Sequence, residues 1–267
     1  MDKLGLIAGN RKLPFLVAQT AKKNNYNIVA LAVKGDTSFG LKRFVDKIYW
    51  VGLDEFGKMF EVFRKEEIKK VVMAGQISPR RLFSREIHKN KELKNLLSNL
   101  KDKRADTIFG AVAGKLKEAG FELVDCAAFL KDFMPAKGTL TVIEPDFALW
   151  EDIYFGLHLT KAIASLDIGQ TVAVKDKAIV AVEGLEGTDN LIRRSGRIAG
   201  SGISVVKVSK PNQDTRFDIP VVGLNTVKNL IKAHAKCLAI EAEKTVFIDR
   251  QESAKLADKN GIAVVSV

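Results

Sequence analysis

"LGLIAGNRKLPFLVAQTAKKNNYNIVALAV", residues 4–33, contains the pattern that decides the fold. The apolar run Leu4–Ala8 predicts a short buried strand, and a glycine turn follows it. Leu13–Lys23 predicts a helix, with Pro14 suited to its first turn. Asn27–Val33 is again apolar and predicts a second buried strand. A strand, a helix and a strand in this order predict a parallel sheet with helices on both faces.

The same alternation continues through the N-terminal half of the chain. Further strands are predicted at Lys47–Val51, Lys69–Gly75 and Phe121–Asp125, and helices at Asp54–Glu67, Ser84–Leu100 and Arg104–Ala119. Pro135 and Gly138 then interrupt the pattern, which favours a linker. We therefore expect an N-terminal domain at 1–132, a linker at 133–140 and a C-terminal domain at 141–267.

The C-terminal half has a different order of elements. A helix is predicted at Asp146–Ser165, and "TVAVKDKAIVAVE" predicts a hairpin that turns at Lys175–Lys177. A short helix with Thr188 as its N-cap and Gly196 near its end follows. Extended chain is predicted at 237–248, before a last helix and strand. The expected fold class is therefore α/β, with a parallel-sheet N-terminal domain and a distinct α+β C-terminal domain.

Charge and hydropathy restrict the class of partner. The 267 residues carry a net charge of +11, which suits an anionic partner such as a nucleotide or an anionic lipid surface. The basic residues are spread along the chain and only 7% of residues are aromatic, so we expect no nucleic-acid partner. No apolar run approaches the roughly 20 residues that span a bilayer. We expect a cytoplasmic protein.

The loop after the first strand invites a nucleotide-binding interpretation. Gly9 and Asn10 precede a helix whose N-terminal amides could hold a phosphate. Arg11 stands where a dinucleotide-binding fingerprint needs a second glycine, so a nicotinamide cofactor is disfavoured. A plain glycine turn and a loop that contacts another ligand both remain open.

The segment "AVEGLEGTDNLIRR" concentrates carboxylates, glycines and arginines. Glu183 and Glu186 could ligate a hard divalent cation, Mg²⁺ or else Mn²⁺, and Arg193 could bind phosphate. This mixture is what phosphoryl chemistry with a metal requires. The alternative is a solvated loop. Zinc is disfavoured, because the histidines show no ligand spacing and no CxxC is present.

A second charged segment, "KPNQDTRFDIPVVG", spans residues 210–223. Its two prolines favour an extended backbone in the residues before them. In an extended chain Asp214, Arg216 and Asp218 would share one face. Two carboxylates and a guanidinium on one face could hold a metal and neutralise a phosphate. The alternative is that both acids only form ion pairs with Arg216 or Lys210.

Both segments resemble the bacterial UDP-2,3-diacylglucosamine pyrophosphatases of the LpxI type. "LDIGQTVAVKDKAIVAVEGLEGTDNLIRR" and "VKVSKPNQDTRFDIPVVGLNT" carry the resemblance, and "GLIAGNRKLP" and "VVMAGQI" extend it over nearly the whole chain. It implies a Rossmann-like N-terminal domain. It also implies Mg²⁺-dependent hydrolysis of the substrate pyrophosphate to 2,3-diacylglucosamine 1-phosphate and UMP, by water attack on the β-phosphorus. Members usually have a second glycine where this chain has Arg11.

The resemblance also implies roles for individual residues. Asp218, Asp214 and Arg216 are expected to be catalytic. Glu183, Glu186, Asp214 and Asp218 are expected to ligate the metal. Substrate is expected to contact Gly9, Asn10, Gln76, Gln170, Gly187, Thr188, Asp189, Arg193, Lys210 and Gln213. The lipid substrate implies peripheral contact with the inner leaflet of the inner membrane, and a homodimer is a further expectation.

Two other classes of function compete with the hydrolase. A non-catalytic protein that binds nucleotide sugars or anionic lipids would keep the same basic residues. The set of carboxylates favours the enzyme, because a pure anion binder would gain from losing negative charge. A basic nucleic-acid binder would show strongly salt-dependent retention of DNA.

Overall fold

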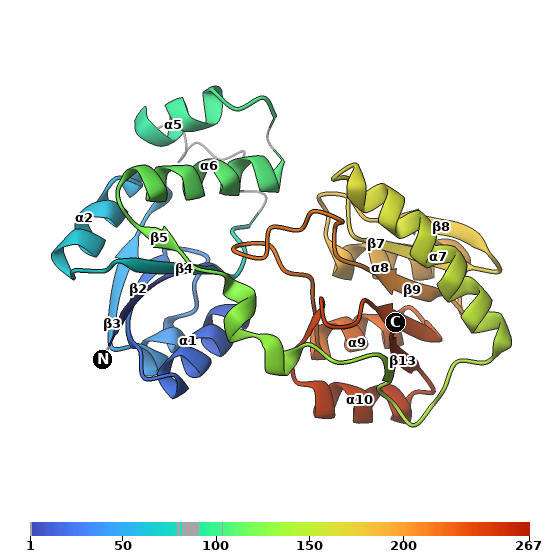
Figure 1. Ribbon diagram of the computed structural model, residues 1–267. Helices are drawn as coiled ribbons and strands as arrows, with labels where there is room; N and C mark the ends of the chain where they lie inside the picture. Colours follow the sequence, from blue (N-terminus) through green and yellow to red (C-terminus); the bar gives the residue numbers. More distant parts are fainter. Residues whose placement is uncertain (1, 79–80, 82–90, 103) are drawn as a thin grey trace. The chain divides into compact units, whose positions relative to one another are not determined.

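The computed structural model describes residues 2–78, 81, 91–102 and 104–267, and the chain divides into two compact units (Figure 1). The first unit comprises Met1–Leu130 together with Asp214–Asp218, and the second comprises Lys131–Gln213 and Ile219–Val267. The division after Leu130 lies just before the predicted linker at 133–140. The sequence did not predict that Asp214–Asp218 would join the first unit.

The first unit is built on a five-stranded sheet with the strand order β3-β2-β1-β4-β5. All four pairs of neighbouring strands are parallel. Its strands are β1 (Lys3–Ala8), β2 (Asn27–Val33), β3 (Lys47–Val51), β4 (Lys70–Ala74) and β5 (Glu122–Leu123). The predicted parallel sheet is confirmed, although β5 is shorter than the predicted strand.

Helices cover both faces of this sheet, as Figure 1 shows for α1 and α6. The helical segments are α1 (Leu13–Lys23), η1 (Phe39–Phe44), η2 (Leu53–Glu55), α2 (Lys58–Lys65), α5 (Lys91–Ser98), α6 (Ala105–Glu118) and η3 (Cys126–Phe129). Phe63 of α2 and Leu116 of α6 are fully buried in one core with residues of β2 and β4. Part of the helix predicted from Ser84, residues 84–90, lies outside the described residues.

The second unit contains a six-stranded mixed sheet with the order β6-β13-β11-β9-β7-β8. β9, β11 and β13 are parallel, whereas β6, β7 and β8 each run antiparallel to their neighbours. The strands are β6 (Gly138–Thr139), β7 (Thr171–Lys175), β8 (Ala178–Val182), β9 (Ser204–Lys207), β11 (Cys237–Ile240) and β13 (Ala263–Ser266). A separate pair joins β10 (Val221–Val222) to β12 (Val246–Phe247). The predicted extended run at 237–248 is therefore two strands in different sheets.

Helices also enclose the second sheet. They are η4 (Lys131–Phe133), α7 (Phe147–Ser165), α8 (Thr188–Ala199), α9 (Leu224–Lys232) and α10 (Arg250–Lys259). Ile153 of α7 packs with Val172 and Val206 on one face, and α8, α9 and α10 contribute to the core on the other. The predicted hairpin is confirmed. Asp176 and Lys177 both have positive φ, 51° and 57°, as a tight turn between twisted strands requires.

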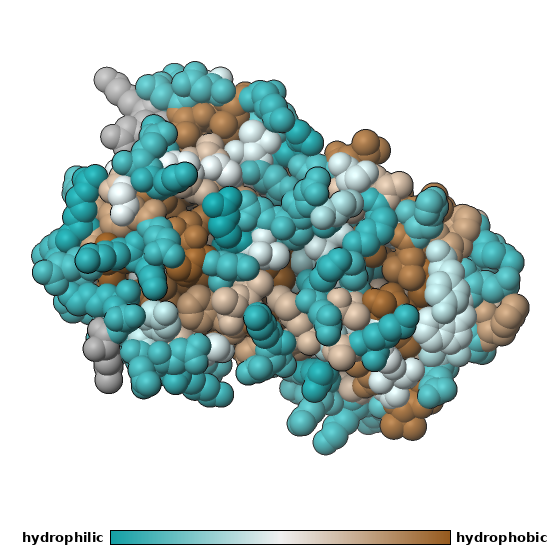
Figure 2. Space-filling view, viewed as in Figure 1, coloured by the Kyte–Doolittle hydropathy of each residue, from teal (hydrophilic) through white to brown (hydrophobic). Residues whose placement is uncertain are grey.

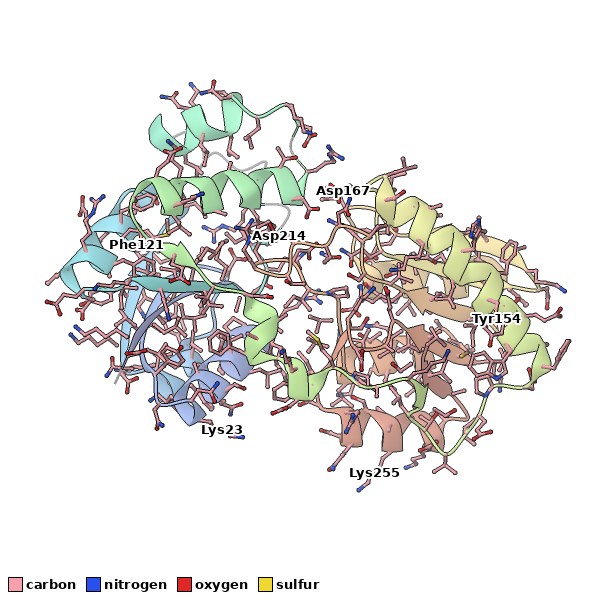
Figure 3. All side chains as sticks on the ribbon, in the orientation of Figure 1. Lys23, Phe121, Tyr154, Asp167, Asp214 and Lys255 are labelled. Atoms are coloured by element: carbon pink, nitrogen blue, oxygen red, sulfur yellow. The ribbon has the colours of Figure 1, made fainter. Side chains whose placement is uncertain are left out.

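The visible surface is mainly hydrophilic, with scattered hydrophobic side chains (Figure 2). Among the exposed hydrophobic residues, Phe147 and Tyr154 of α7 are 80% and 63% exposed. Figure 3 labels Tyr154 on α7. In the described part of the chain, no helix has the length and apolar character needed to cross a membrane.

Candidate functional site

The carboxyl ends of β1 and β4 form a narrow junction in the first unit. α1 and β2 lead away from β1 on one side, while β4 lies on its other side, so this is the point where the strand order reverses. Ligands of open parallel sheets bind at such points. The predicted residues Gly9, Asn10 and Gln76 come together here, since Asn10 N donates to Gln76 O at 2.7 Å.

Gly9 is needed at this junction because no side chain would fit there. A Cβ atom added to Gly9 would lie 2.6 Å from the Gln76 carbonyl oxygen. Beside it, Asn10 Oδ1 is buried and has no hydrogen-bond partner among the described residues, so a ligand donor could satisfy it. Arg11 has a φ of 65°, which is the left-handed conformation that glycine favours. The loop therefore keeps a glycine-like backbone although the residue is arginine.

The segment Asp214–Asp218 is a turn, and the predicted extended conformation is wrong. Asp218 N and Phe217 N donate to Asp214 O at 3.0 and 3.3 Å. The Asp214 carboxylate also accepts a hydrogen bond from Arg216 N at 3.2 Å. Such local bonds from an aspartate favour a turn over extended chain. The three charged side chains therefore do not share one extended face.

A two-point ion pair joins Asp214 and Arg216 within this turn. Arg216 Nε donates to Asp214 Oδ1 at 2.8 Å, and Arg216 Nη2 donates to Asp214 Oδ2 at 2.6 Å. The hydrogen bonds from Arg216 lower the pKa of Asp214, and the bonds to Asp214 raise the pKa of Arg216. Asp214 is therefore held ionised, with both oxygens engaged, which makes it a poor base.

Phe217 anchors the turn to the first unit. Its ring lies 5.6 Å from the ring of Phe109 in α6, and it packs against the core beneath α2 and α6. Figure 3 labels Asp214 at the start of this turn. The turn therefore presents Asp218 from a position fixed by Phe217 on one side and by the Asp214–Arg216 pair on the other.

A buried polar cluster lies at one edge of the second sheet. The end of β9, the start of β7, the end of β8 and the N-terminus of α8 meet there. Lys207 Nζ donates to Thr188 Oγ1 at 2.7 Å, and Thr188 Oγ1 donates to Glu183 Oε1 at 2.9 Å. Gln170 N donates to Glu183 Oε2 at 3.3 Å, and Thr171 Oγ1 lies 3.3 Å from Thr188 Oγ1.

Thr188 is not the N-cap of α8, contrary to the prediction. The helix is capped by Gly187, which has a φ of 82°, and Thr188 is its first residue. The Thr188 hydroxyl is occupied by Glu183 and Lys207 instead of a backbone amide. Gly196 lies near the end of α8, as predicted, and a Cβ added there would lie 2.7 Å from Ala233 Cα.

Lysine and glutamine side chains continue this edge beyond β9. Lys210 Nζ forms an ion pair with Asp167 Oδ1 at 2.6 Å. Gln213 Oε1 accepts hydrogen bonds from Lys210 N at 2.8 Å and from Ser209 Oγ at 3.2 Å. These contacts fix the backbone that leads into the Asp214–Asp218 turn.

Comparisons with known proteins give the family. The LpxI N-terminal domain matches residues 3–133, and the LpxI C-terminal domain matches residues 136–265. The chain is 30% identical to the UDP-2,3-diacylglucosamine pyrophosphatase LpxI of Caulobacter vibrioides, over 100% of this chain and 98% of that protein. The chain belongs to the LpxI family.

Similarity to solved structures is weak. A glycinamide-RNase-transformylase T from Mycobacterium tuberculosis matches at 11% identity and a TM-score of 0.28, over 68% of this chain and 44% of that one. An N5-carboxyaminoimidazole ribonucleotide synthetase from Thermotoga maritima matches at 15% identity and a TM-score of 0.25, over 70% of this chain and 43% of that one. The chain spans less than half the length of either protein, and these matches carry no functional argument.

In this LpxI chain the predicted site residues fall into separate groups. Gly9, Asn10 and Gln76 meet in the first unit, where Asp214, Arg216 and Asp218 form the turn. Gln170, Glu183, Gly187, Thr188, Lys210 and Gln213 lie along one edge of the second sheet. Sequence reasoning missed Lys207, Thr171 and Asp167. Lys207 did carry a signal, because it is a lone charge in the apolar strand "SVVKVS".

Three predicted residues near α8 have partners of their own. Glu186 pairs with Arg194, and this hydrogen bond raises the pKa of Arg194. Asp189 Oδ2 accepts a hydrogen bond from Asn225 Nδ2 at 2.7 Å. Arg193 donates to Asn190 in the same helix. Their predicted roles with substrate and metal stay predictions.

The predicted carboxylate ligands can be compared with what a Mg²⁺ site needs. In the described part of the chain, no three His, Cys, Asp or Glu side chains group around a common point. Glu183 and Asp214 each have both carboxylate oxygens in hydrogen bonds. Mg²⁺ commonly takes only one or two protein carboxylates and completes its shell with water and substrate phosphate. A Mg²⁺ site of that kind would need only one or two of the predicted carboxylates, and the metal and its ligands stay predictions.

Proposed function

We propose that this LpxI-family protein hydrolyses UDP-2,3-diacylglucosamine to 2,3-diacylglucosamine 1-phosphate and UMP. The similarity in sequence extends over the full chain, as expected of proteins that share an activity. The observation that carries the mechanism is the Asp214–Asp218 turn, because it holds a guanidinium and a carboxylate on an anchored piece of backbone.

In the proposed reaction a water molecule attacks the β-phosphorus. Asp218 accepts a proton from this water as the new bond from oxygen to phosphorus forms. The bond between the β-phosphorus and the bridging oxygen breaks, and UMP leaves with that oxygen. Arg216, positioned by Asp214, neutralises charge that develops on the phosphate oxygens. Mg²⁺, or Mn²⁺ in its place, would supply further neutralisation of the pyrophosphate when bound.

Asp218 is favoured over Asp214 as the base. Asp214 is tied to Arg216 by two hydrogen bonds, and its lowered pKa makes it slow to accept a proton. Asp214 therefore acts in this proposal as a positioning residue for Arg216, and Asp218 contacts the water.

The test measures UMP release by the full chain with Mg²⁺, with EDTA, and in the variant Asp218→Asn. We expect the wild type to release UMP with Mg²⁺ and to lose this activity with EDTA. Asp218→Asn should lower kcat about a thousandfold or more, because it removes a base or metal ligand. Asparagine keeps the size of the half-buried Asp218 side chain, so the variant should remain folded, and its melting curve checks this.

Asp176→Asn is the matched control, because Asp176 lies in an exposed hairpin turn where asparagine accepts a positive φ. Its kcat should equal that of the wild type. Near-normal kcat in Asp218→Asn would end the catalytic role of Asp218. Binding of substrate by the wild type without any UMP release would favour the non-catalytic binder instead.

We also propose that the protein acts at the surface of the inner membrane, where its lipid substrate would reside, and that it can form a homodimer. The charge of +11 and the exposed rings of Phe147 and Tyr154 support contact with an anionic bilayer. Flotation with vesicles that contain phosphatidylglycerol, and not with neutral vesicles, is expected. Equal recovery with both would contradict electrostatic attachment, and light scattering would give the mass in solution.

A further inference from the structure

Lys207 has an unusual environment for a lysine. It ends β9, it is only 6% exposed, and it lies among apolar strand residues. Its Nζ donates to Thr188 Oγ1 at 2.7 Å and to Thr171 Oγ1 at 3.4 Å. Neither partner is charged. In the described part of the chain, no carboxylate oxygen lies within 4.0 Å of Lys207 Nζ.

Two other lysines at this edge of the sheet show the contrast. Lys161 Nζ lies 2.6 Å from Glu241 Oε2, and Lys210 Nζ lies 2.6 Å from Asp167 Oδ1. Both are less deeply buried than Lys207 and both have a direct carboxylate partner. Buried charges are normally paired, because removing them from water is costly. Lys207 is therefore the lysine of this edge that lacks a direct counter-charge.

The nearest acid in the hydrogen-bond chain is Glu183, and it is separated from Lys207 by a hydroxyl. Thr188 Oγ1 accepts from Lys207 and donates to Glu183 Oε1 at 2.9 Å. An ammonium group has three N–H donors, of which the two threonines use two. The third has no acceptor in the described residues. Lys207 can therefore still donate to a ligand.

The surroundings of Lys207 suit an anion with several acceptor oxygens. The loop Gly184–Gly187 connects β8 to α8, and Gly187 adopts a φ of 82° where the helix begins. The first amides of a helix of this length favour negative charge. A lysine and the backbone amides of a glycine-bearing loop at a helix start are the donors that bind phosphate in P-loops. Here the lysine comes from the neighbouring strand.

We propose that Lys207 binds a phosphate group of the ligand through its third N–H donor and supplies the counter-charge of that phosphate, while Thr171 and Thr188 hold the ammonium group in place. This inference rests on the proposed function and adds a phosphate-binding residue to it. The phosphate belongs to a phosphomonoester, either a nucleoside 5′-monophosphate or a sugar 1-phosphate, since the reaction produces one of each. Glu183 accepts the proton of the Thr188 hydroxyl, which leaves the Thr188 oxygen to accept from Lys207.

A purely structural role makes a different prediction. If Lys207 only balances the charge of Glu183 through Thr188, its removal lowers stability and leaves phosphate binding by the folded protein unchanged. The two roles are therefore separated by a binding measurement on folded protein.

The experiment compares Lys207→Met with the wild type by calorimetric titration of the full chain with UMP and, separately, with glucosamine 1-phosphate. Lys175→Met is the matched control. Lys175 is a partly buried lysine at the opposite end of β7, where its Nζ donates to Ala199 O at 3.0 Å. We expect Lys207→Met to weaken the binding of one of the two ligands at least tenfold. Lys175→Met should leave the affinity for both ligands unchanged. The ligand whose binding is weakened shows whether Lys207 binds the phosphate of the nucleotide or that of the sugar.

If Lys207→Met does not fold, the double variant Lys207→Met with Glu183→Gln removes both buried charges and is titrated instead. The same tenfold loss is expected. Wild-type affinity for both ligands in either folded variant overturns the inference, and so does a wild type that binds neither ligand. UMP release from UDP-2,3-diacylglucosamine is measured in parallel. Its absence in the wild type would overturn the proposed function, whereas its presence with unchanged binding in Lys207→Met would overturn this inference alone.

Discussion

The substitution Gly9→Ala tests the close approach between the loop after β1 and the end of β4. The added Cβ would lie 2.6 Å from Gln76 O and 2.8 Å from Gln76 N, and both are backbone atoms that cannot rotate away. The loop must shift, which costs roughly 1–3 kcal/mol for overpacking. The shift also stretches the bond of 2.7 Å between Asn10 N and Gln76 O, and losing it costs roughly a further 1–3 kcal/mol.

The expected loss is therefore about 2–6 kcal/mol in the free energy of unfolding of the first unit, which corresponds to a fall in melting temperature of roughly 6 °C or more. Trp50 lies in β3 of the first unit and Trp150 in α7 of the second, so Trp150→Phe leaves Trp50 as the tryptophan that reports on the first unit. Thermal unfolding of Gly9→Ala in the Trp150→Phe variant, followed by Trp50 fluorescence, gives the melting temperature of the first unit.

Gly114→Ala is the matched control in the same unit. Gly114 lies in α6, and a Cβ there meets nothing within 4 Å. Alanine in a helix interior is more favourable than glycine by about 1 kcal/mol, so this variant should melt a few degrees higher. The steric argument is refuted if Gly9→Ala unfolds within about 1 °C of the wild type.

Two further predictions concern a titrating carboxylate and the anchor of the turn. Hydrogen bonds from Lys34, Gly52 and Lys58 lower the pKa of Glu55 from its ordinary value of 4.5 to about 2. The ionised Glu55 side chain therefore stabilises the fold fully above pH 4.5, and this stabilisation is lost as the pH falls towards 2. Acid titrations should therefore show a smaller loss of stability between these values in Glu55→Gln than in the wild type, and identical curves would contradict this. Phe217→Ala should destabilise the first unit by about 1–3 kcal/mol, because its half-buried ring packs on Phe109. Phe147→Ala removes an exposed ring and should change the free energy of the transition reported by Trp50 by less than about 0.5 kcal/mol. Equal effects of the two substitutions would refute the role of Phe217 as an anchor of the turn.

The sequence predicts the framework of this fold well, because hydrophobic periodicity depends on short stretches of chain. The parallel strands of the first unit and the hairpin at Asp176 and Lys177 follow from local patterns. Asp146 caps α7 where the sequence places the start of a helix, since its side chain accepts from Leu149 N.

The conformation of Asp214–Asp218 could not be predicted in the same way. Pro211 and Pro220 restrict only the residues before them, and the turn depends on contact between Phe217 and α6 of the first unit. No local pattern encodes a contact between segments so far apart in sequence. The environment of Lys207 could not be predicted either, because a single charge in an apolar strand does not show which side chains surround it.

The return of Asp214–Asp218 to the first unit has a consequence for biosynthesis. The ribosome completes Met1–Leu130 long before it reaches Phe217, which contributes to the same core. At elongation rates of 5–20 residues per second, the surface of α6 around Phe109 stays uncovered for roughly 5–15 seconds. In this interval the Phe109 ring lacks its partner Phe217. The first 130 residues expressed alone would never acquire Phe217. Co-expression of a peptide that contains Phe217 would supply this ring from a second chain.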